Sequence, residues 1–497
     1  MGFFRLRSLQ EKMLSQGPIS NQFTSRSETT RTDRTFIGIL LLLFSISCLK
    51  HFCTFATGPT LLEYDAVEYW ERGGRVAEGD LLQVRDAVNY RGPLYPWIIG
   101  ICRWLWPSHA LMLLSVVQHI LSLASEWLAA RMCWEVLRTR RAFLIGYAIA
   151  VAGITSPWFA NVVLTEILFQ FVFTCCVWML VRYHREPKIS TAMGFGGFLA
   201  LSVLTRPIPK LLWIPMLLLY FCHCTSRMTN NPISSKRIAM HAMASLLSMY
   251  VVMLPWTVRN HFYFDNSSVA KVPPINKWVV CFHAGAGGEL VIPRSDAGDK
   301  LRSYLPDIDD NADLRQDGYG VLRRLSQAGI SERQIDDLVS HVCWDAILEN
   351  PNQFLWKSFK RFGNFWRCRV KQYPFYSTYP SAEERLPQAY PGQSSWRLES
   401  IAKWYECILM NSLFTHVRFI EIYSLTCMIG LVILFYRLET RIVALAIFGI
   451  FAYFAAVTAA LEIENYRYRA VLEPIIALAI TGTIDRKRRN LNSEIVG

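Results

Sequence analysis

Three acidic residues stand where they could act as catalytic groups: Glu63, Asp65 and Glu68 lie just past the end of an apolar run near the N-terminus. They open a polar insertion, residues 63–96, whose far end, YRGPLYP, leads straight into the next apolar run. A carboxylate in such a place can serve as a general base that takes a proton from an attacking hydroxyl. We therefore interpret residues 63–96 as a catalytic loop at a membrane surface.

Other ionisable residues lie beside or within apolar segments, where a charge is costly and needs an explanation. Together with Asp65 they fall at one predicted depth on one predicted side: Glu166, Arg206, Lys210, Arg259, Glu462, Glu464, Arg467 and Arg469. Arginine and lysine neutralise phosphate while a carboxylate activates a nucleophile, so this set suits an enzyme that handles an anionic lipid head group. The alternative is that basic side chains at span ends reach up to lipid phosphates without a specific role.

Two acids lie within predicted spans. Glu166 stands in the run VVLTEILFQF with no adjacent base. The alternative of basic side chains that reach up to lipid phosphates does not explain this acid. Glu126 lies nearer the other end of its span, where Arg131 can help it to reach water. We therefore include Glu166 in the candidate site and leave Glu126 out.

The composition indicates the class of protein that must carry these residues. Of the 497 residues, 52% are hydrophobic and 18% are charged, and the mean hydropathy is +0.21. The apolar residues gather in blocks of membrane-spanning length, which is typical of a polytopic membrane protein. The net charge of +13 resides largely in short connections between these blocks, where topology rules place it, so we do not expect nucleic-acid binding.

We expect about ten transmembrane helices from the lengths of the apolar blocks. They are placed at 35–56, 109–133, 142–155, 160–181, 189–204, 207–222, 238–255, 417–435, 442–461 and 468–484. Basic residues mark alternate loops of this arrangement, which predicts that both termini are cytoplasmic and that the protein is multi-pass in the inner (plasma) membrane. The candidate site residues then all face the outside.

This topology predicts a domain organisation. Residues 1–34 and 485–497 form cytoplasmic tails, 35–258 a membrane-embedded catalytic module with its first outer loop at 58–108, 259–416 an outer-side (periplasmic) domain, and 417–484 the last transmembrane helices. Residues 93–106 are apolar but too short to cross, and their Trp and Tyr content favours an interfacial helix; the alternative, an extra span, would invert every later loop.

The outer domain offers two further expectations. Residues 331–366 have helical periodicity with a break at Asn350 and Pro351, which predicts two amphipathic helices, the second of which could lie on the membrane. Three cysteines, Cys281, Cys343 and Cys368, fall in this domain and would permit one disulfide.

Several segments together resemble the GT-C glycosyltransferase superfamily, in the branch of the dolichyl-phosphate-mannose protein mannosyltransferases and the lipid A aminoarabinose transferase. The segments are DAVEYWERGGRVAEG, YRGPLYPWIIG, SPWFANVVLTEILFQF, LTRP, LPWTVRN and NYRYRAVLEP, in the expected order from Asp65 to Pro474. The family often has a second acid directly after the first-loop Asp, whereas this chain has Ala66, so a pair of acids there must use Glu63 or Glu68.

The resemblance implies a GT-C fold and an inverting transfer of a sugar from a polyprenyl-phosphate donor to a lipid, glycan or protein acceptor on the outer face. By it, Asp65 is the general base and Glu166 lines the same cavity. Arg467 and Arg469, with Arg206 and Arg259 as weaker candidates, hold the carrier phosphate. Tyr69 and Tyr90 could stack on a sugar or lie in the headgroup layer. We expect no cofactor and no metal, and the main alternative function is a transporter or flippase of a lipid-linked substrate.

Overall fold

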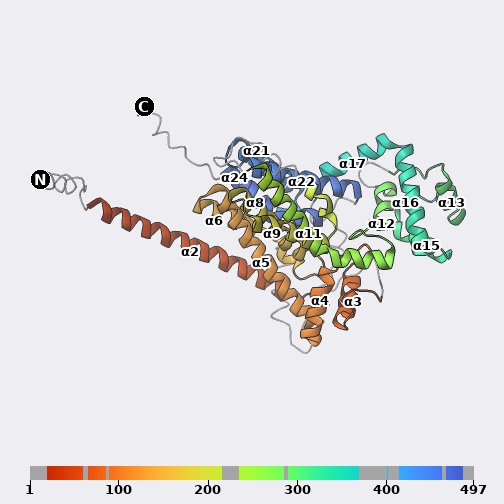
Figure 1. The fold of residues 1–497 in the computed structure, drawn as a ribbon, viewed down its shortest axis with the longest axis horizontal. Coiled ribbons are helices and arrows are strands. Elements are labelled where there is room, and N and C mark those ends of the chain that lie inside the picture. Colours follow the sequence, from red (N-terminus) through yellow and green to blue (C-terminus); the bar gives the residue numbers. More distant parts are fainter. Residues whose placement is uncertain are drawn as a thin grey trace, which may run out of the picture. The chain divides into compact units, whose positions relative to one another are not determined.

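The computed structural model describes residues 20–59, 65–85, 89–214, 234–284, 289–368, 400, 404, 413–461 and 466–484, with side chains from residue 33 onward. The chain divides into two compact units, residues 1–49 and 50–497. Helix α2 (Ser20–Ala56) begins in the first unit and ends in the second. The residues of the candidate site lie in the second unit. Figure 1 shows the helices coloured along the chain, from red near the N-terminus to blue near the C-terminus.

The protein is an α-helical polytopic membrane protein. Within the described ranges, six helical segments are long and apolar enough to cross a membrane: Asp33–Ala56, Pro107–Leu137, Glu166–Arg185, Ser235–Phe264, Val417–Tyr436 and Arg441–Leu461. Two shorter apolar helices lie at the predicted fifth span and in the C-terminal part of the predicted tenth span: Ile189–Thr205 and Glu473–Ile484. The third predicted span is the 13-residue helix α6 (Arg140–Ala152). The second half of the sixth predicted span, 207–222, lies outside the described residues.

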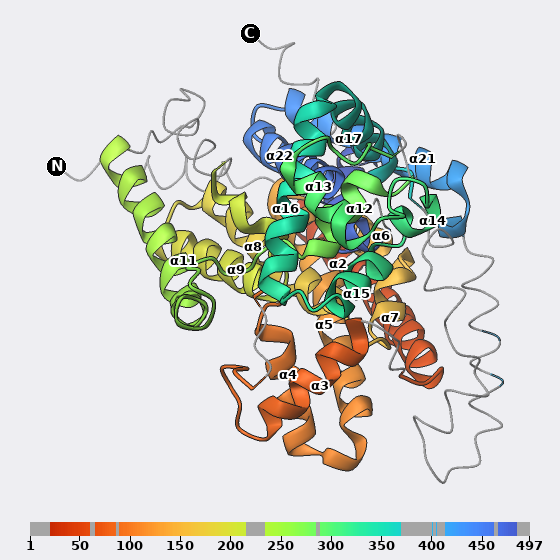
Figure 2. The ribbon, with the colours of Figure 1, turned by 90° about the vertical axis from the view of Figure 1, so that its right-hand side faces the viewer.

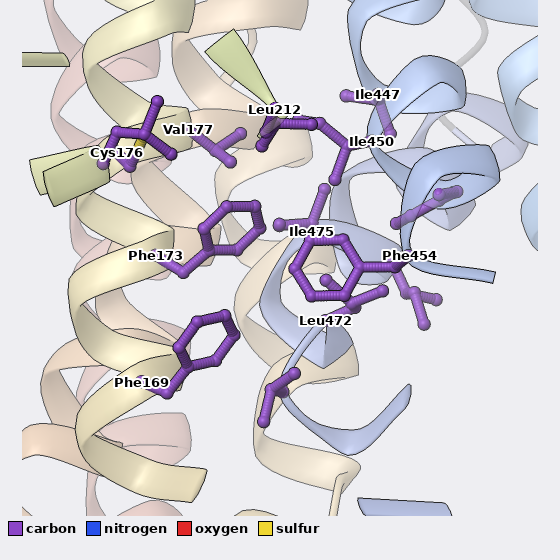
Figure 3. Packing of buried hydrophobic residues seen from close by; sticks show 14 of the residues in the cluster. Phe169, Phe173, Cys176, Val177, Leu212, Ile447, Ile450, Phe454, Leu472 and Ile475 are labelled. Carbon is purple, nitrogen blue, oxygen red and sulfur yellow. The ribbon is translucent and has the colours of Figure 1, made fainter. Parts of the chain in front are cut away.

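The membrane helices pack around one large apolar core. It joins α5 (Ala110–Leu137), α8 (Glu166–Arg185), α9 (Ile189–Thr205), α11 (Ser235–Phe264), α21 (Val417–Tyr436), α22 (Arg441–Leu461) and α24 (Glu473–Ile484). Figure 3 shows Phe169 and Phe173 of α8 pointing toward Phe454 of α22; the Phe173 and Phe454 ring centroids are 5.1 Å apart. Phe169 lies one helical turn after Glu166, so this packing fixes the start of α8.

The first loop folds into two helices that touch closely, α3 (Asp65–Ala77) and α4 (Leu94–Leu105) (Figure 2). Glycines make the contact possible, because a Cβ on Gly73 would lie 2.2 Å from Ile99 Cγ2 and one on Gly100 would lie 2.4 Å from Val76 Cγ1. Helix α4 covers the predicted interfacial segment 93–106 and has 12 residues, fewer than a membrane crossing needs. Its interfacial position stays a prediction.

Residues 274–365 form a helical domain with its own apolar core. Its helices are α12 (Pro274–Phe282), α13 (Asp296–Tyr304), α14 (Ala312–Gln316), α15 (Gly318–Gln327), α16 (Glu332–Glu349) and α17 (Pro351–Phe365). A capping box between Ser331 and Gln334 starts α16, and α17 begins at Pro351, so the predicted break at Asn350 and Pro351 is found. Cys281 and Cys343 carry free thiols and are not joined to each other.

Three predicted boundaries differ from the structure. The fourth span was expected from residue 160, but α8 begins at Glu166, after the short helix α7 (Thr155–Phe159). The tenth was expected to run unbroken from residue 468, but a turn separates α23 (Tyr466–Ala470) from α24, which has Pro474 in its first turn, where proline is tolerated. The domain boundary predicted at 258 falls inside α11, which continues to Phe264.

Candidate functional site

Asp65 is the first residue of α3 and lies where three elements meet. Arg91, in the loop between α3 and α4, donates from Nη2 to Asp65 Oδ1 at 2.6 Å and to Glu68 Oε2 at 2.9 Å. The Glu68 carboxylate also accepts from Arg72, one turn later on α3. The side chain of Asp65 is 32% exposed, so its carboxylate is accessible to solvent although Arg91 binds it.

Glu166 opens α8 and is buried at 1% exposure. Its Oε1 accepts hydrogen bonds from Arg467 Nε and, at 3.2 Å, from Arg206 Nη1. Its Oε2 is also buried and accepts no hydrogen bond from the residues that the structure describes. Arg467 also reaches Asp65, with Nη1 3.4 Å from Oδ2, so one arginine bridges the two predicted catalytic acids.

These seven residues form what we call the charge cluster: Asp65, Glu68, Glu166, Arg72, Arg91, Arg206 and Arg467. They come from α3, the loop before α4, α8, the end of α9 and α23. Three negative charges against four positive ones leave one positive charge. Among the described residues, the charge cluster therefore carries a small net positive charge, which favours an anionic ligand.

The loop geometry explains why Arg91 reaches the cluster. A Cβ on Gly92 would lie 2.0 Å from the backbone oxygen of Leu204, near the end of α9. Only glycine therefore lets the loop cross the end of α9 this closely. That crossing places Arg91 on the same side as Arg206, which follows α9 directly.

The arginines also set the proton affinity of Asp65. Burial on its own would raise the pKa of Asp65, but the charges of Arg91, Arg467 and Arg206 and the hydrogen bond from Arg91 outweigh it and lower that pKa to about 2. In the absence of substrate Asp65 is therefore a carboxylate at any physiological pH, and a weak base.

The two predicted tyrosines lie against Arg91. Its guanidinium carbon is 4.9 Å from the Tyr69 ring centroid and 5.4 Å from that of Tyr90. Tyr69 is buried and meets Tyr95 edge to face at 5.3 Å, and Tyr95 donates to Gln118 on α5 at 3.0 Å. The tyrosines thus hold Arg91 in place; their predicted contact with a sugar stays a prediction.

Two predicted phosphate ligands lie outside the charge cluster. Arg469 donates to the backbone oxygens of Trp366, at 3.0 Å, and Cys368. Arg259 donates to the backbone oxygens of Leu82, at 3.0 Å, and Gln83, at 2.7 Å. Each holds a loop segment, and a role of either in binding phosphate remains a prediction.

The excluded acid, Glu126, has different neighbours from those expected. Lys50 donates to it at 2.7 Å, and His51 Nε2 lies 3.4 Å away. Arg131, the expected partner, instead lies 3.6 Å from Glu135, one turn along α5. Glu126 is therefore buried in a polar contact between α2 and α5, away from Asp65 and Glu166.

Other predicted members are placed elsewhere or lie beyond the described ranges. Lys210 donates to Ser268. Glu63, Glu462 and Glu464 lie outside the described residues. The described ranges contain no group of three or more His, Cys, Asp or Glu side chains that could hold a metal ion.

Two residues of this region were missed from the sequence. Arg91 was visible only as a base between aromatic residues at the exit of an acidic loop. Glu473, at the start of α24, is half-buried and accepts from Thr155 Oγ1 at 2.5 Å and Tyr466 OH at 2.8 Å. Tyr466 precedes Arg467, so Glu473 anchors the short helix that carries the bridging arginine.

Comparisons with known proteins match this chain at the level of structure. A scan against protein-family models finds no matching model, and a search of curated proteins finds no match. A solved structure of the archaeal oligosaccharyltransferase AglB from Archaeoglobus fulgidus, with an inhibitory peptide and a dolichol-phosphate, is 11% identical with a TM-score of 0.44; the match covers 89% of this chain and 50% of that one. ArnT from Cupriavidus metallidurans bound to undecaprenyl phosphate is 12% identical with a TM-score of 0.37, over 88% of this chain and 78% of that one.

The likeness between this chain and these neighbours is one of fold alone. The chain spans half the length of the AglB structure that it matches. Both TM-scores lie below 0.5, so the residues assigned to the site rest on the contacts within this chain alone.

Proposed function

We propose that this protein is a membrane glycosyltransferase that moves a sugar from a polyprenyl-phosphate donor to an acceptor hydroxyl on the outer face of the membrane, with inversion. The observation that carries the proposal is Arg467, which bridges Asp65 and Glu166 at the meeting point of α3, α8 and α23. A partly exposed carboxylate beside several arginines offers both functions that the reaction needs: a base for the nucleophile and positive charge for a phosphate leaving group.

In the proposed reaction, Asp65 takes the proton of the acceptor hydroxyl as its oxygen attacks the anomeric carbon. The new carbon–oxygen bond forms while the bond from that carbon to the phosphate oxygen breaks, and the electron pair leaves with the polyprenyl phosphate. Arg467, Arg206 and Arg91 stabilise the negative charge on that leaving group. Glu166 keeps Arg467 and Arg206 directed at it, because both donate to the same carboxylate oxygen.

The resting ion pairs imply an order of events. As long as Arg91 and Arg467 pair with Asp65, its pKa of about 2 makes it a poor proton acceptor. A donor phosphate competes for these arginines and adds a negative charge nearby, and both changes raise the pKa of a carboxylate. We infer that the donor binds first and thereby turns Asp65 into a base that can accept the proton of the acceptor.

Binding of undecaprenyl phosphate, a stand-in for the leaving group, tests the phosphate site. Native mass spectrometry of the purified protein should show that Arg467→Gln lowers its affinity by roughly tenfold or more, since a charge-assisted hydrogen bond contributes about 1.5–3 kcal/mol. Arg418→Gln, at an exposed position, is the matched control and should leave the affinity unchanged. Equal affinity of wild type and Arg467→Gln would contradict the proposal.

A further inference from the structure

Helix α17 buries charged side chains and exposes large apolar ones, which is the reverse of a helix at a water-exposed surface. Lys357 and Arg361, one turn apart, are buried at 0% and 1% exposure. Lys357 Nζ donates to the backbone oxygens of Cys281 at 2.8 Å and His283 at 3.1 Å. Arg361 donates to the backbone oxygen of Val280 at 3.0 Å. The two cations thus satisfy carbonyls at the C-terminal end of α12, where a helix dipole favours positive charge.

The opposite face of α17 presents large apolar side chains outward. Leu355, Trp356 and Phe359 are 65%, 54% and 66% exposed. Trp344 and Leu348, one turn apart on α16, are 61% and 59% exposed. We call these five residues the apolar patch. Soluble surfaces rarely carry so many large apolar groups together, and such a patch marks a surface that contacts a protein or a membrane.

The place of α17 in the fold decides between these two partners. It packs along the transmembrane helix α22 (Figures 1 and 2). Phe365, its last residue, belongs to the membrane core, and the adjoining Trp366 meets Phe451 of α22 with ring centroids 5.5 Å apart. Phe451 lies ten residues before the end of α22 at Leu461, which is roughly 15 Å along the helix axis. The C-terminal end of α17 therefore meets α22 well inside the apolar length of that candidate transmembrane helix.

The neighbouring surface of α22 is also apolar and exposed, as Phe448 at 53% and Leu445 at 41% show. Helix α17, which carries three of the five patch residues, therefore packs on a candidate transmembrane helix whose exposed surface is apolar. Lys360, exposed at the edge of the patch, has its Nζ 5.1 Å from the Trp356 ring centroid. A cation paired with a tryptophan suits the boundary between acyl chains and phosphate head groups.

We propose that helices α16 and α17 are seated in the lipid layer through the apolar patch, with the acyl chains covering Leu355, Trp356 and Phe359 and head-group phosphates meeting Lys360. The buried Lys357 and Arg361 then tether the rest of the domain to a membrane-seated helix. Arg469 donates to the backbone oxygens of Trp366 and Cys368 just after α17, so this lipid contact also supports α23, which carries Arg467. The inference does not depend on the proposed function.

Photocrosslinking of the whole protein in nanodiscs of phosphatidylethanolamine and phosphatidylglycerol tests this seating. A benzophenone side chain is introduced by Phe359→p-benzoylphenylalanine, a conservative aromatic change at an exposed position. Phe448→p-benzoylphenylalanine on α22 is the lipid-facing control. Tyr319→p-benzoylphenylalanine, at a 57% exposed position on α15 of the same domain, is the control for the domain surface away from the patch.

The expected result is a lipid adduct at position 359 with a yield close to that at 448 and several-fold above that at 319. The absence of lipid adduct at 359, with a strong adduct at 448, would overturn the proposal. A protein adduct at 359, formed when membrane extract is added, in place of the lipid adduct would also overturn it and would identify the patch as a protein-docking surface.

Discussion

At the scale of single residues, the site is defined by what the arginines do to Asp65. Arg91 and Arg467 hold one carboxylate oxygen each, at 2.6 Å and 3.4 Å. The same arginines are the groups that a phosphate would attract most strongly. Asp65 therefore pairs with the arginines that we propose bind the donor phosphate, and these arginines keep Asp65 a weak base. A phosphate that displaces Asp65 from them would restore its basicity.

Replacing Asp65 by Asn removes the base and keeps the size of the side chain. We expect Asp65→Asn to reduce sugar transfer by about 100-fold or more, the usual contribution of general-base catalysis, while the protein stays folded in the membrane. Turnover of a lipid-linked sugar in proteoliposomes measures this. Glu68→Gln is the matched control, because Glu68 shares Arg91 with Asp65 but has no proposed proton transfer; an equal loss in both variants would argue against the base assignment.

The pH dependence of catalysis follows from the lowered pKa of Asp65. The folded protein lowers the pKa of Asp65 to about 2, so Asp65 contributes to stability above its unfolded pKa, and this contribution is lost as the pH falls toward about 2. The same low pKa keeps Asp65 ionised in the free enzyme over the pH range of catalysis. In the free enzyme Asp65 should therefore cause no decline in kcat/KM between pH 8 and about pH 4. With bound donor phosphate its pKa rises, so the acid-side decline in kcat should appear at a higher pH than that in kcat/KM. Coincident profiles would contradict donor-first activation.

At the scale of elements, close contacts place the loop that carries Arg91. The Gly92 backbone crosses the end of α9, and a Cβ there would lie 2.0 Å from a backbone oxygen that cannot turn aside. We expect Gly92→Ala to displace Arg91 from the cluster and to lower the affinity for undecaprenyl phosphate. Gly449→Ala in α22, where an added Cβ meets nothing within 4 Å, should bind as wild type does. Unchanged binding by Gly92→Ala would show that Arg91 does not depend on this crossing.

Arg469 and Arg467 stand two residues apart on α23 but are predicted to respond differently to substitution. Arg469→Gln removes one donor each from the backbone oxygens of Cys368 and Trp366, although Trp366 still accepts from Ser424 Oγ at 2.7 Å. A hydrogen bond from a charged donor contributes about 1.5–3 kcal/mol. We therefore expect a lower unfolding temperature with little change in phosphate affinity. A variant with a wild-type unfolding temperature and weak phosphate binding would restore the phosphate role that the sequence predicts for Arg469.

The sequence predicted most of the helices but not all of the residues at which they begin and end. Apolar length located the helices, and Asn350 and Pro351 located the start of α17. The break between α23 and α24 was missed because the span was placed by its apolar length, although Arg469, Glu473 and Pro474 interrupt residues 468–484. The inverted face of α17 was equally hidden, since periodicity shows that a helix has two faces but not which one is buried.

At the scale of the whole molecule, the sequence could assign residues to the site by type and depth but not by contact. Asp65, Glu166, Arg206 and Arg467 come together from positions up to 402 residues apart, as their common predicted depth suggested. Arg259 and Arg469 share that depth and yet hold backbone segments. The positions of the spans predict how far along the membrane normal a residue lies. They do not predict the direction of its side chain, which depends on how the helices pack.

The whole-molecule account also separates an enzyme from a flippase. A flippase would move a lipid-linked sugar intact, whereas the proposed reaction splits the carrier from its sugar. Native mass spectrometry that follows lipids in proteoliposomes distinguishes intact translocation from release of free polyprenyl phosphate. Release that requires an added acceptor would support transfer.

The most direct test of the central claim is mass spectrometry of membrane lipids and envelope glycans from cells that carry either the wild-type chain or Asp65→Asn at equal abundance. The account predicts that an acceptor carrying one added sugar is present with the wild-type chain and missing with Asp65→Asn, while the intact polyprenyl-phosphate sugar accumulates in the variant. Identical lipid and glycan profiles in the two strains would contradict the assignment of this protein as a transferase that uses Asp65 as its base.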